Sequence, residues 1–255
     1  MPKVIEKRLI EEFKDREAFS REELFDFYRC FEPDLKEGTL GWRIYDLKEK
    51  NIIKTVKRGL YKISYRPRYK PEISPELFKL GKKIGAKFEE VKFCIWDTSW
   101  LNEFLQHQSS KLMMIAEIEK GFEESLYYEL KDNFKNEIYL NPHEREINLY
   151  ITESRLPIVI KKLVTRSPLD TRIEKKVKLP TPQLEKILVD LFAEEKLFFY
   201  LQGSEMIHLY ENALNNYSIN FTRLFSYAKR RERDQEIKQF MSNHLLHLVK
   251  DFIDD

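Results

Sequence analysis

The sequence predicts a mixed α/β protein, α+β overall, organised in two parts. Residues 1–65 contain three segments with apolar residues at helical spacing, followed by two short β-rich segments. Residues 66–73 carry two prolines and no periodicity, which is typical of an extended linker. Residues 74–255 alternate strand-like and helix-like segments and become mostly helical after about residue 155. We therefore expect a small N-terminal domain, a linker, and a larger α/β domain with a helical C-terminal subdomain over about 155–255.

The N-terminal domain begins with three predicted helices. The first extends from Val4 to about Lys14, and the second follows Ser20, which forms a capping box with the glutamate three residues later. The third starts at Thr39 as N-cap and continues to about Lys50. Its apolar residues at positions 40, 44 and 47 share one face, so this face should pack against the first two helices.

Two β-rich segments follow the third helix. Residues 52–56 and 60–64 are separated by Lys57-Arg58-Gly59, which can form a tight turn, so the two segments predict a hairpin. Three helices followed by a hairpin is the element order of a winged helix-turn-helix. In this class of domain the third helix enters the major groove of DNA and the hairpin contacts the phosphate backbone.

The charge distribution supports this interpretation. The chain has 45 basic and 43 acidic residues, a net charge of +2, but residues 41–70 hold 10 basic and 2 acidic residues, which gives +8. Concentrated positive charge is typical of a surface that binds a polyanion. Our candidate DNA-binding residues are therefore Thr39, Trp42, Arg43, Tyr45, Lys50, Lys54, Lys57, Arg58 and Lys62. The alternative is a winged helix that binds proteins and whose basic residues only keep it soluble.

The second domain should start with a helix from Ser74-Pro75 to about residue 87. Strands are predicted over 91–96, 112–118, 137–140 and 147–151, with helices after Asp97 and after Gly121. Later helices are predicted to start at Thr181-Pro182 and to cover 204–216, 219–231 and 234–252. A small basic patch over 227–233 is interpreted as cations that favour a helix C-terminus.

No pattern for catalysis is complete. The sequence lacks the glycine-rich loops that bind nucleotide phosphates, and His244 with His247 has no further ligands to form a metal site. The one carboxylate set to consider is Asp97, Glu117 and Glu119, which could hold Mg²⁺ for phosphodiester hydrolysis, but the lysine that such nucleases place two residues after the acid is missing. We expect a non-enzymatic protein without cofactor or metal, and keep a metal-dependent nuclease as the alternative function.

The sequence also indicates a compartment. It contains no apolar run of about 18 residues and no signal-peptide pattern at its N-terminus. The two cysteines, Cys30 and Cys94, lie in apolar surroundings and are expected to be buried thiols in a reducing environment. We therefore expect a cytoplasmic protein with no membrane association.

Two stretches resemble a known family. Thr39 to Leu47, leading into Ile52-Ile53 and Arg58-Gly59-Leu60-Tyr61, is similar to the AbiEi antitoxins of type IV toxin–antitoxin systems, as is the segment 179–191. One departure is Gln183-Leu184, where the family tends to have an acidic–basic pair. The resemblance implies a cytoplasmic autoregulator and antitoxin in abortive infection, that is, in antiviral defence. Its winged helix would bind repeats in double-stranded DNA at its own promoter. Its second domain would counter a nucleotidyltransferase-like toxin, and a direct complex with that toxin is not implied.

Overall fold

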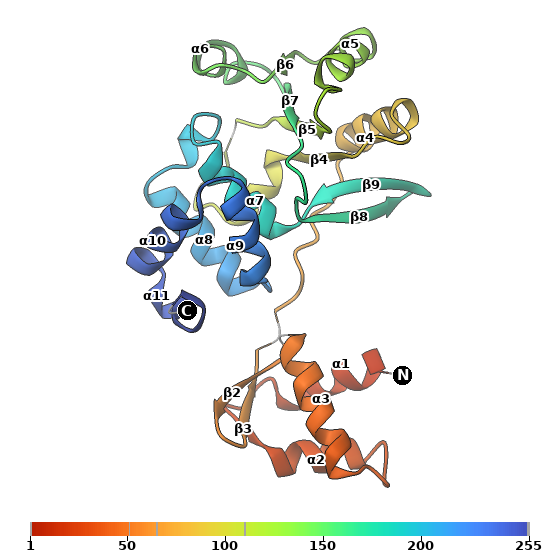
Figure 1. The fold of residues 1–255 in the computed structure, drawn as a ribbon, viewed down its shortest axis with the longest axis vertical. Coiled ribbons are helices and arrows are strands. Elements are labelled where there is room, and N and C mark those ends of the chain that lie inside the picture. Colours follow the sequence, from red (N-terminus) through yellow and green to blue (C-terminus); the bar gives the residue numbers. More distant parts are fainter. Residues whose placement is uncertain (1, 51, 65, 110, 254–255) are drawn as a thin grey trace. The chain divides into compact units, whose positions relative to one another are not determined.

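The structure, a computed structural model, describes residues 2–253 except 51, 65 and 110 (Figure 1). The chain divides into two compact units. The first comprises the chain up to Arg68 together with residues 216–218, and the second comprises the remainder. The division falls inside the segment 66–73 that the sequence predicts as a linker.

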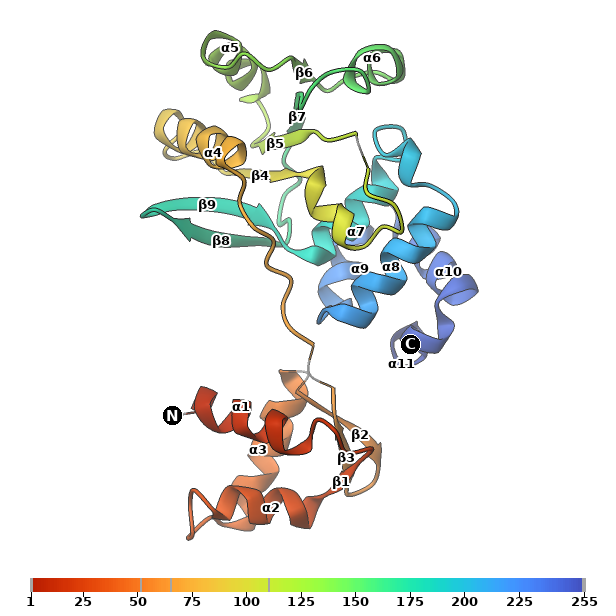
Figure 2. The same ribbon diagram turned by 180° about the vertical axis from the view of Figure 1, so that it is seen from behind.

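The first unit has the element order of a winged helix. Its elements are α1 (Pro2–Phe13), β1 (Phe19–Ser20), α2 (Arg21–Arg29), α3 (Glu37–Glu49), β2 (Ile53–Lys57) and β3 (Leu60–Ile63). The strands form an antiparallel sheet in the order β1-β3-β2 (Figures 1 and 2). The sequence did not predict β1 because it has only two residues, too few to show alternation.

Local sequence features account for the helices of this unit. The capping box at the start of α2 is confirmed: the Glu23 backbone N–H donates to Ser20 Oγ at 3.1 Å, and the Ser20 N–H donates to the Glu23 carboxylate at 2.7 Å. The predicted start of α3 at Thr39 is wrong. The helix begins at Glu37, because the Lys36 carbonyl accepts the Thr39 N–H at 3.0 Å without help from a capping side chain.

The core of the first unit forms from the predicted apolar faces. Leu40, Ile44 and Leu47 of α3 are buried, as expected, and they pack in one cluster with residues from α1, α2 and the hairpin. Cys30 is exposed, so the expectation that both cysteines are buried is wrong for this one and right for Cys94. Cys30 follows the last residue of α2, outside the apolar face of that helix.

The second unit contains a four-stranded sheet, a separate hairpin and a group of helices. The elements up to the end of the sheet are α4 (Pro75–Lys87), β4 (Phe93–Asp97), the 3₁₀ helix η1 (Thr98–Glu103), β5 (Met114–Ile118), α5 (Glu123–Asn133), β6 (Ile138–Leu140), α6 (Glu144–Glu146), the π-helix η2 (Ile147–Ile151) and β7 (Ile158–Lys162). The strand order is β4-β5-β7-β6, with β4 antiparallel to β5 and the other pairs parallel.

The rest of the second unit is a hairpin followed by helices. These elements are β8 (Leu169–Glu174), β9 (Val177–Pro182), α7 (Leu184–Ala193), η3 (Phe199–Leu201), α8 (Ser204–Asn216), α9 (Phe221–Arg230), α10 (Asp234–His244) and α11 (Leu246–Ile253). Helices α7 to α11 gather on the side of the sheet away from α4 (Figures 1 and 2). The predicted 66–73 linker is tied to this unit in its second half, because Tyr69 donates to the Trp100 carbonyl at 2.6 Å and the Trp100 indole donates to the Glu72 carbonyl at 2.9 Å.

Several predicted elements of the second unit are wrong. Residues 147–151 form a helical turn rather than a strand, because its buried side chains are Ile147 and Ile151, one helical turn apart, whereas Leu149 is exposed. The mostly helical region expected after 155 contains β7, β8 and β9. Thr181 and Pro182 end β9 instead of starting a helix, and the predicted helix over 234–252 is interrupted at Leu245.

Candidate nucleic-acid interface

The hairpin of the first unit presents positive charge on a tight turn. Gly59, at φ +77°, provides the left-handed conformation that the turn requires. Lys54, Lys57 and Arg58 are exposed and Lys62 is half-buried. In the part of the chain that the structure describes, none of these four cations forms an ion pair with an acidic side chain. Their charges are therefore available for a ligand.

The exposed face of α3 is aromatic. Trp42 is 75% exposed and Tyr45 is 58% exposed, and their rings meet edge to face with centroids 6.1 Å apart. Together with Gly38 and Gly41 they line a shallow hollow of about 450 Å³. Two glycines leave this side of the helix without bulk, so the two aromatic rings dominate the surface.

The remaining basic candidates are already engaged. Arg43 forms an ion pair with Glu32 at 2.6 Å, and its guanidinium lies over the Tyr28 ring, 4.5 Å from the centroid. Burial raises the pKa of Tyr28 to about 12, so its ring stays neutral. Lys50 pairs with Asp46 and Glu6, and hydrogen bonds to these carboxylates raise its pKa. The structure thus places Arg43 and Lys50 in contacts that hold the domain together.

The charge of the basic segment belongs to the hairpin rather than to the third helix. Helix α3 carries two basic residues (43, 48) against three acidic ones (37, 46, 49), a net charge of −1. The hairpin from Ile53 to Ile63 carries four basic residues and no acidic one, a net charge of +4. Attraction of a polyanion therefore falls to the hairpin rather than to α3, and Arg66, Arg68 and Lys70 after the hairpin add three further positive charges.

The three carboxylates considered for a nuclease do not come together. In the antiparallel pair, Asp97 lies opposite Met114 and Glu117 opposite Cys94. Asp97 and Glu117 are thus three positions apart along the sheet, or about 10 Å, and on opposite faces. Asp97 instead accepts hydrogen bonds from the Ser99 N–H at 3.0 Å and from Ser74 Oγ at 3.1 Å, which caps η1 and secures the start of α4.

Glu117 belongs to a buried charge cluster that the sequence did not reveal. Lys186 on α7 is completely buried and donates to both Glu117 oxygens at 2.6 and 2.8 Å and to Asp190. Tyr227 of α9 donates its hydroxyl to Asp190 at 2.8 Å. The only sequence signal was a lysine and an aspartate four residues apart in a helix whose other residues, apart from Glu185, are apolar.

Burial sets the protonation behaviour of this cluster. Burial raises the pKa of Glu117, an effect that the Lys186 ammonium opposes. Burial alone would lower the pKa of Lys186, but the carboxylates of Asp190 and Glu117 hold it well above its ordinary value. Perturbed groups often mark functional sites, but here every polar partner is internal and the lysine has no exposed surface. The cluster is therefore a structural junction between the sheet and the helices.

The described residues do not form a metal site. In that part of the chain no three or more His, Cys, Asp and Glu side chains gather in a way that could hold a metal ion. His244 and His247 lie on different helices and are both exposed, so they do not share the single helix that the sequence predicts over 234–252. Across the described residues, no helix combines the length and apolar character needed to cross a membrane.

The fold and its charged hairpin define a class: a winged-helix protein whose basic wing is joined to an α/β unit with a helical C-terminal part. The chain belongs to DUF6577, a family of unknown function, whose match covers residues 39–247. This match begins within α3 and includes the hairpin and almost all of the second unit. No curated protein matches the chain.

Proposed function

We propose that the protein binds double-stranded DNA through its winged helix. The observation that carries this proposal is the set of four cations on the β2–β3 hairpin that have no acidic partner in the described structure, in a domain whose element order is that of winged-helix DNA-binding proteins. Phosphate contacts by Lys and Arg supply most of the affinity in this kind of interaction. The hairpin tip with Lys57 and Arg58 is the natural place for those contacts.

The two elements then have different tasks. Helix α3 has a net charge of −1, so it would contribute little to phosphate attraction. Its exposed residues Thr39, Trp42 and Tyr45 would meet base edges in the major groove, where apolar groups contact thymine methyls and hydroxyls bond to bases. Affinity would come from the hairpin and sequence preference from the helix.

The biological role extends this proposal. On the resemblance to AbiEi antitoxins, the protein would be a cytoplasmic, non-enzymatic autoregulator that binds repeats in its own promoter. Its second unit would counter a nucleotidyltransferase-like toxin without a required complex. Co-expression with the neighbouring gene tests this part: rescue of growth supports it, and persistent toxicity contradicts it.

Fluorescence anisotropy with a labelled duplex of the upstream region tests DNA binding directly. Lys57→Ala combined with Arg58→Ala should weaken binding by about tenfold or more at moderate salt. It should also reduce the slope of log K against log salt by about 0.9 for each phosphate that the variant no longer neutralises. Lys7→Ala is the matched control, because it removes an exposed cation of the same unit outside α3 and the hairpin. Binding that is equally tight in all variants contradicts the proposed surface.

The aromatic hollow on α3 supports a second candidate, a protein-interaction module. Exposed Trp and Tyr side chains around a hollow are typical of hot spots in protein interfaces. Trp42→Ala with Tyr45→Ala separates the two functions. In a DNA-binding protein this change should relax sequence preference while the hairpin still gives non-specific affinity. If the full chain shows no duplex binding at 50 mM salt, where electrostatic contacts are strong, the second candidate is favoured.

A further inference from the structure

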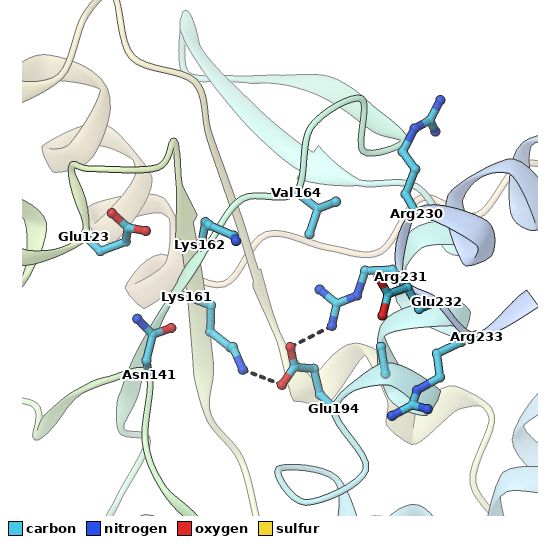
Figure 3. Close-up of a pocket in the computed structure, with 11 residues that line it drawn as sticks. Glu123, Asn141, Lys161, Lys162, Val164, Glu194, Arg230, Arg231, Glu232 and Arg233 are labelled. Carbon is cyan, nitrogen blue, oxygen red and sulfur yellow. Dashed lines mark hydrogen bonds and ion pairs between the residues drawn. The ribbon is translucent and has the colours of Figure 1, made fainter.

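A polar cavity lies in the second unit, and one of its lining residues, Arg231, connects it to the buried charge cluster. Its volume is about 440 Å³, within the range of small-molecule sites. Lysines 161 and 162 come from β7, and three arginines come from the end of α9 and the turn that follows it (Figure 3). Against these five cations stand three glutamates, at positions 123, 194 and 232, so the lining has a net charge of +2.

The cavity sits where an α/β sheet normally binds ligands. Strands β5, β7 and β6 are parallel, with Ile118 opposite Lys162 and Leu140 opposite Ile160, so their carboxyl ends meet at one edge. Asn141 directly follows β6, and Lys162 ends β7. Ligands of open α/β sheets bind outside the carboxyl ends of the strands. The cavity therefore has the position of a binding site as well as its charge.

One wall of the cavity is held rigidly by internal ion pairs. Glu194 accepts from Arg231 at 2.7 Å and from Lys161 (Figure 3), and Arg231 also lies 3.7 Å from Asp190 of the buried cluster. Burial alone would raise the pKa of Glu194, but Lys161 and Arg231 hold it below its ordinary value. These three side chains are paired with one another, with a net charge of +1, and Arg231 also faces the Asp190 carboxylate, so this wall is held in place by internal contacts.

Two further cations have no acidic partner in the part of the chain that the structure describes. They are Lys162 on the strand and Arg230 at the end of α9, and both are exposed. A cation at a helix C-terminus stabilises the helix dipole, which would explain Arg230 alone. It does not explain Lys162, which comes from a strand and also lines the cavity. In Figure 3 the Arg230 side chain extends away from Lys162, so it would turn inward to share a ligand with that lysine. The unpaired charge is thus supplied from two independent elements.

We propose that this cavity binds a small ligand through its phosphate groups. Lys162 and Arg230 would contact the phosphate oxygens, since guanidinium and ammonium groups form strong charge-assisted hydrogen bonds to phosphate, whereas Arg233 is already paired with Glu236. No aromatic side chain lines the cavity among the described residues, so recognition rests on the phosphate and not on a stacked base. The site is independent of the winged helix and of DNA binding.

Isothermal titration of the full chain with pyrophosphate, ATP, inorganic phosphate and citrate tests this site. The proposal expects saturable binding of pyrophosphate or ATP at one site per chain. Lys162→Ala with Arg230→Ala should weaken that binding by at least about tenfold, since each removes a charge-assisted hydrogen bond. Lys229→Ala is the matched control: it removes an exposed cation next to Arg230 that does not line the cavity, and it should change affinity less than twofold.

The outcomes separate the possibilities. Competition of ATP by pyrophosphate shows that the phosphates carry recognition and supports the proposal. Binding of ATP without any binding of pyrophosphate contradicts it, because the nucleoside would then carry recognition. Citrate binding as tightly as pyrophosphate indicates a general anion surface and overturns it. Displacement of pyrophosphate by duplex DNA in a manner that depends on Lys162 also overturns it, because the surface would then belong to nucleic acid. No binding at millimolar ligand, or binding unaffected by the double change, overturns it as well.

Discussion

Replacement of Lys186 by methionine should strongly destabilise the second unit. The ammonium group is completely buried and is the shared partner of Glu117 and Asp190. Methionine has a similar length, so the change removes the charge without opening a large cavity. Removing one partner of a buried ion pair costs about 3–5 kcal/mol, because the other charge stays buried without compensation. For a domain of this size each kcal/mol lowers Tm by about 2–4 °C, so Tm should fall by about 6–20 °C.

Tryptophan fluorescence during urea unfolding measures this loss of stability in the second unit. Trp96 and Trp100 are 1% and 5% exposed and belong to the second unit, whereas Trp42 in the first unit is already 75% exposed. The emission shift therefore reports mainly on the second unit. Loss of stability should appear as a lower urea midpoint with an unchanged slope.

The pH dependence has a definite sign. In Lys186→Met the Glu117 carboxyl stays buried but loses the ammonium that opposes the rise of its pKa, so its folded-state pKa lies further above its unfolded value of about 4. The folded state then binds protons more readily than the unfolded state, so the variant gains relative stability as pH falls. The stability gap between parent and variant should be smaller at about pH 5 than at about pH 8.

A triple variant provides the control for charge imbalance. Glu117→Met and Asp190→Asn, added to Lys186→Met, remove all three charges and keep an oxygen at position 190 for the Tyr227 hydroxyl. Replacement of a whole buried ion cluster by neutral groups is often close to neutral in stability. The reasoning is refuted if Lys186→Met costs less than about 1 kcal/mol, or if the triple variant is no more stable than the single one.

Three further predictions concern packing and charge elsewhere. Gly81→Ala should destabilise the second unit by about 1 kcal/mol in urea unfolding, because the added Cβ would lie 2.4 Å from a buried isoleucine methyl. Gly85→Ala on the same helix has no atom nearer than 3.6 Å to the added Cβ, so it should stabilise the unit by up to about 1 kcal/mol. Arg43→Ala should lower protection of α2 and α3 amides in hydrogen exchange by about 1 kcal/mol, and unchanged protection would contradict its structural role. Glu194→Gln should make the free energy of unfolding depend less on pH under acidic conditions. The lowered pKa of Glu194 contributes stability that is present above about pH 4.3 and lost as pH falls. An identical midpoint of acid unfolding in parent and variant would contradict this.

The helices and strands that the sequence predicts correctly are those with a local signal. The capping box at Ser20 and the Ser74-Pro75 start of α4 are both found, because a cap depends on residues within one turn. The hairpin turn at Gly59 has its expected left-handed glycine. By contrast, Lys175 and Lys176 form the turn between β8 and β9 at φ +48° and +67°. Because this turn contains no glycine or asparagine, the sequence gives no signal that predicts it.

Patterns that depend on a distant partner were misinterpreted. Residues 147–151 alternate like a strand, but only a neighbouring surface decides which side chains are buried, and that surface selects Ile147 and Ile151. Strand β7 has three fully buried β-branched residues, 158 to 160, and lies in the middle of the sheet. So short an apolar run cannot be distinguished from a buried helix segment by periodicity.

By itself, the sequence determined the mixed α/β class, the winged-helix order and the concentration of basic residues over 41–70, since these follow from local spacing and composition. The tertiary structure alone decided which charges are free. Lys50 pairs with Glu6, 44 residues away, and Lys186 with Glu117, 69 residues away, whereas the hairpin cations and Lys162 find no acid in the described structure. A charge becomes available or neutralised through its neighbours in space, and these are set by chain segments far apart in sequence.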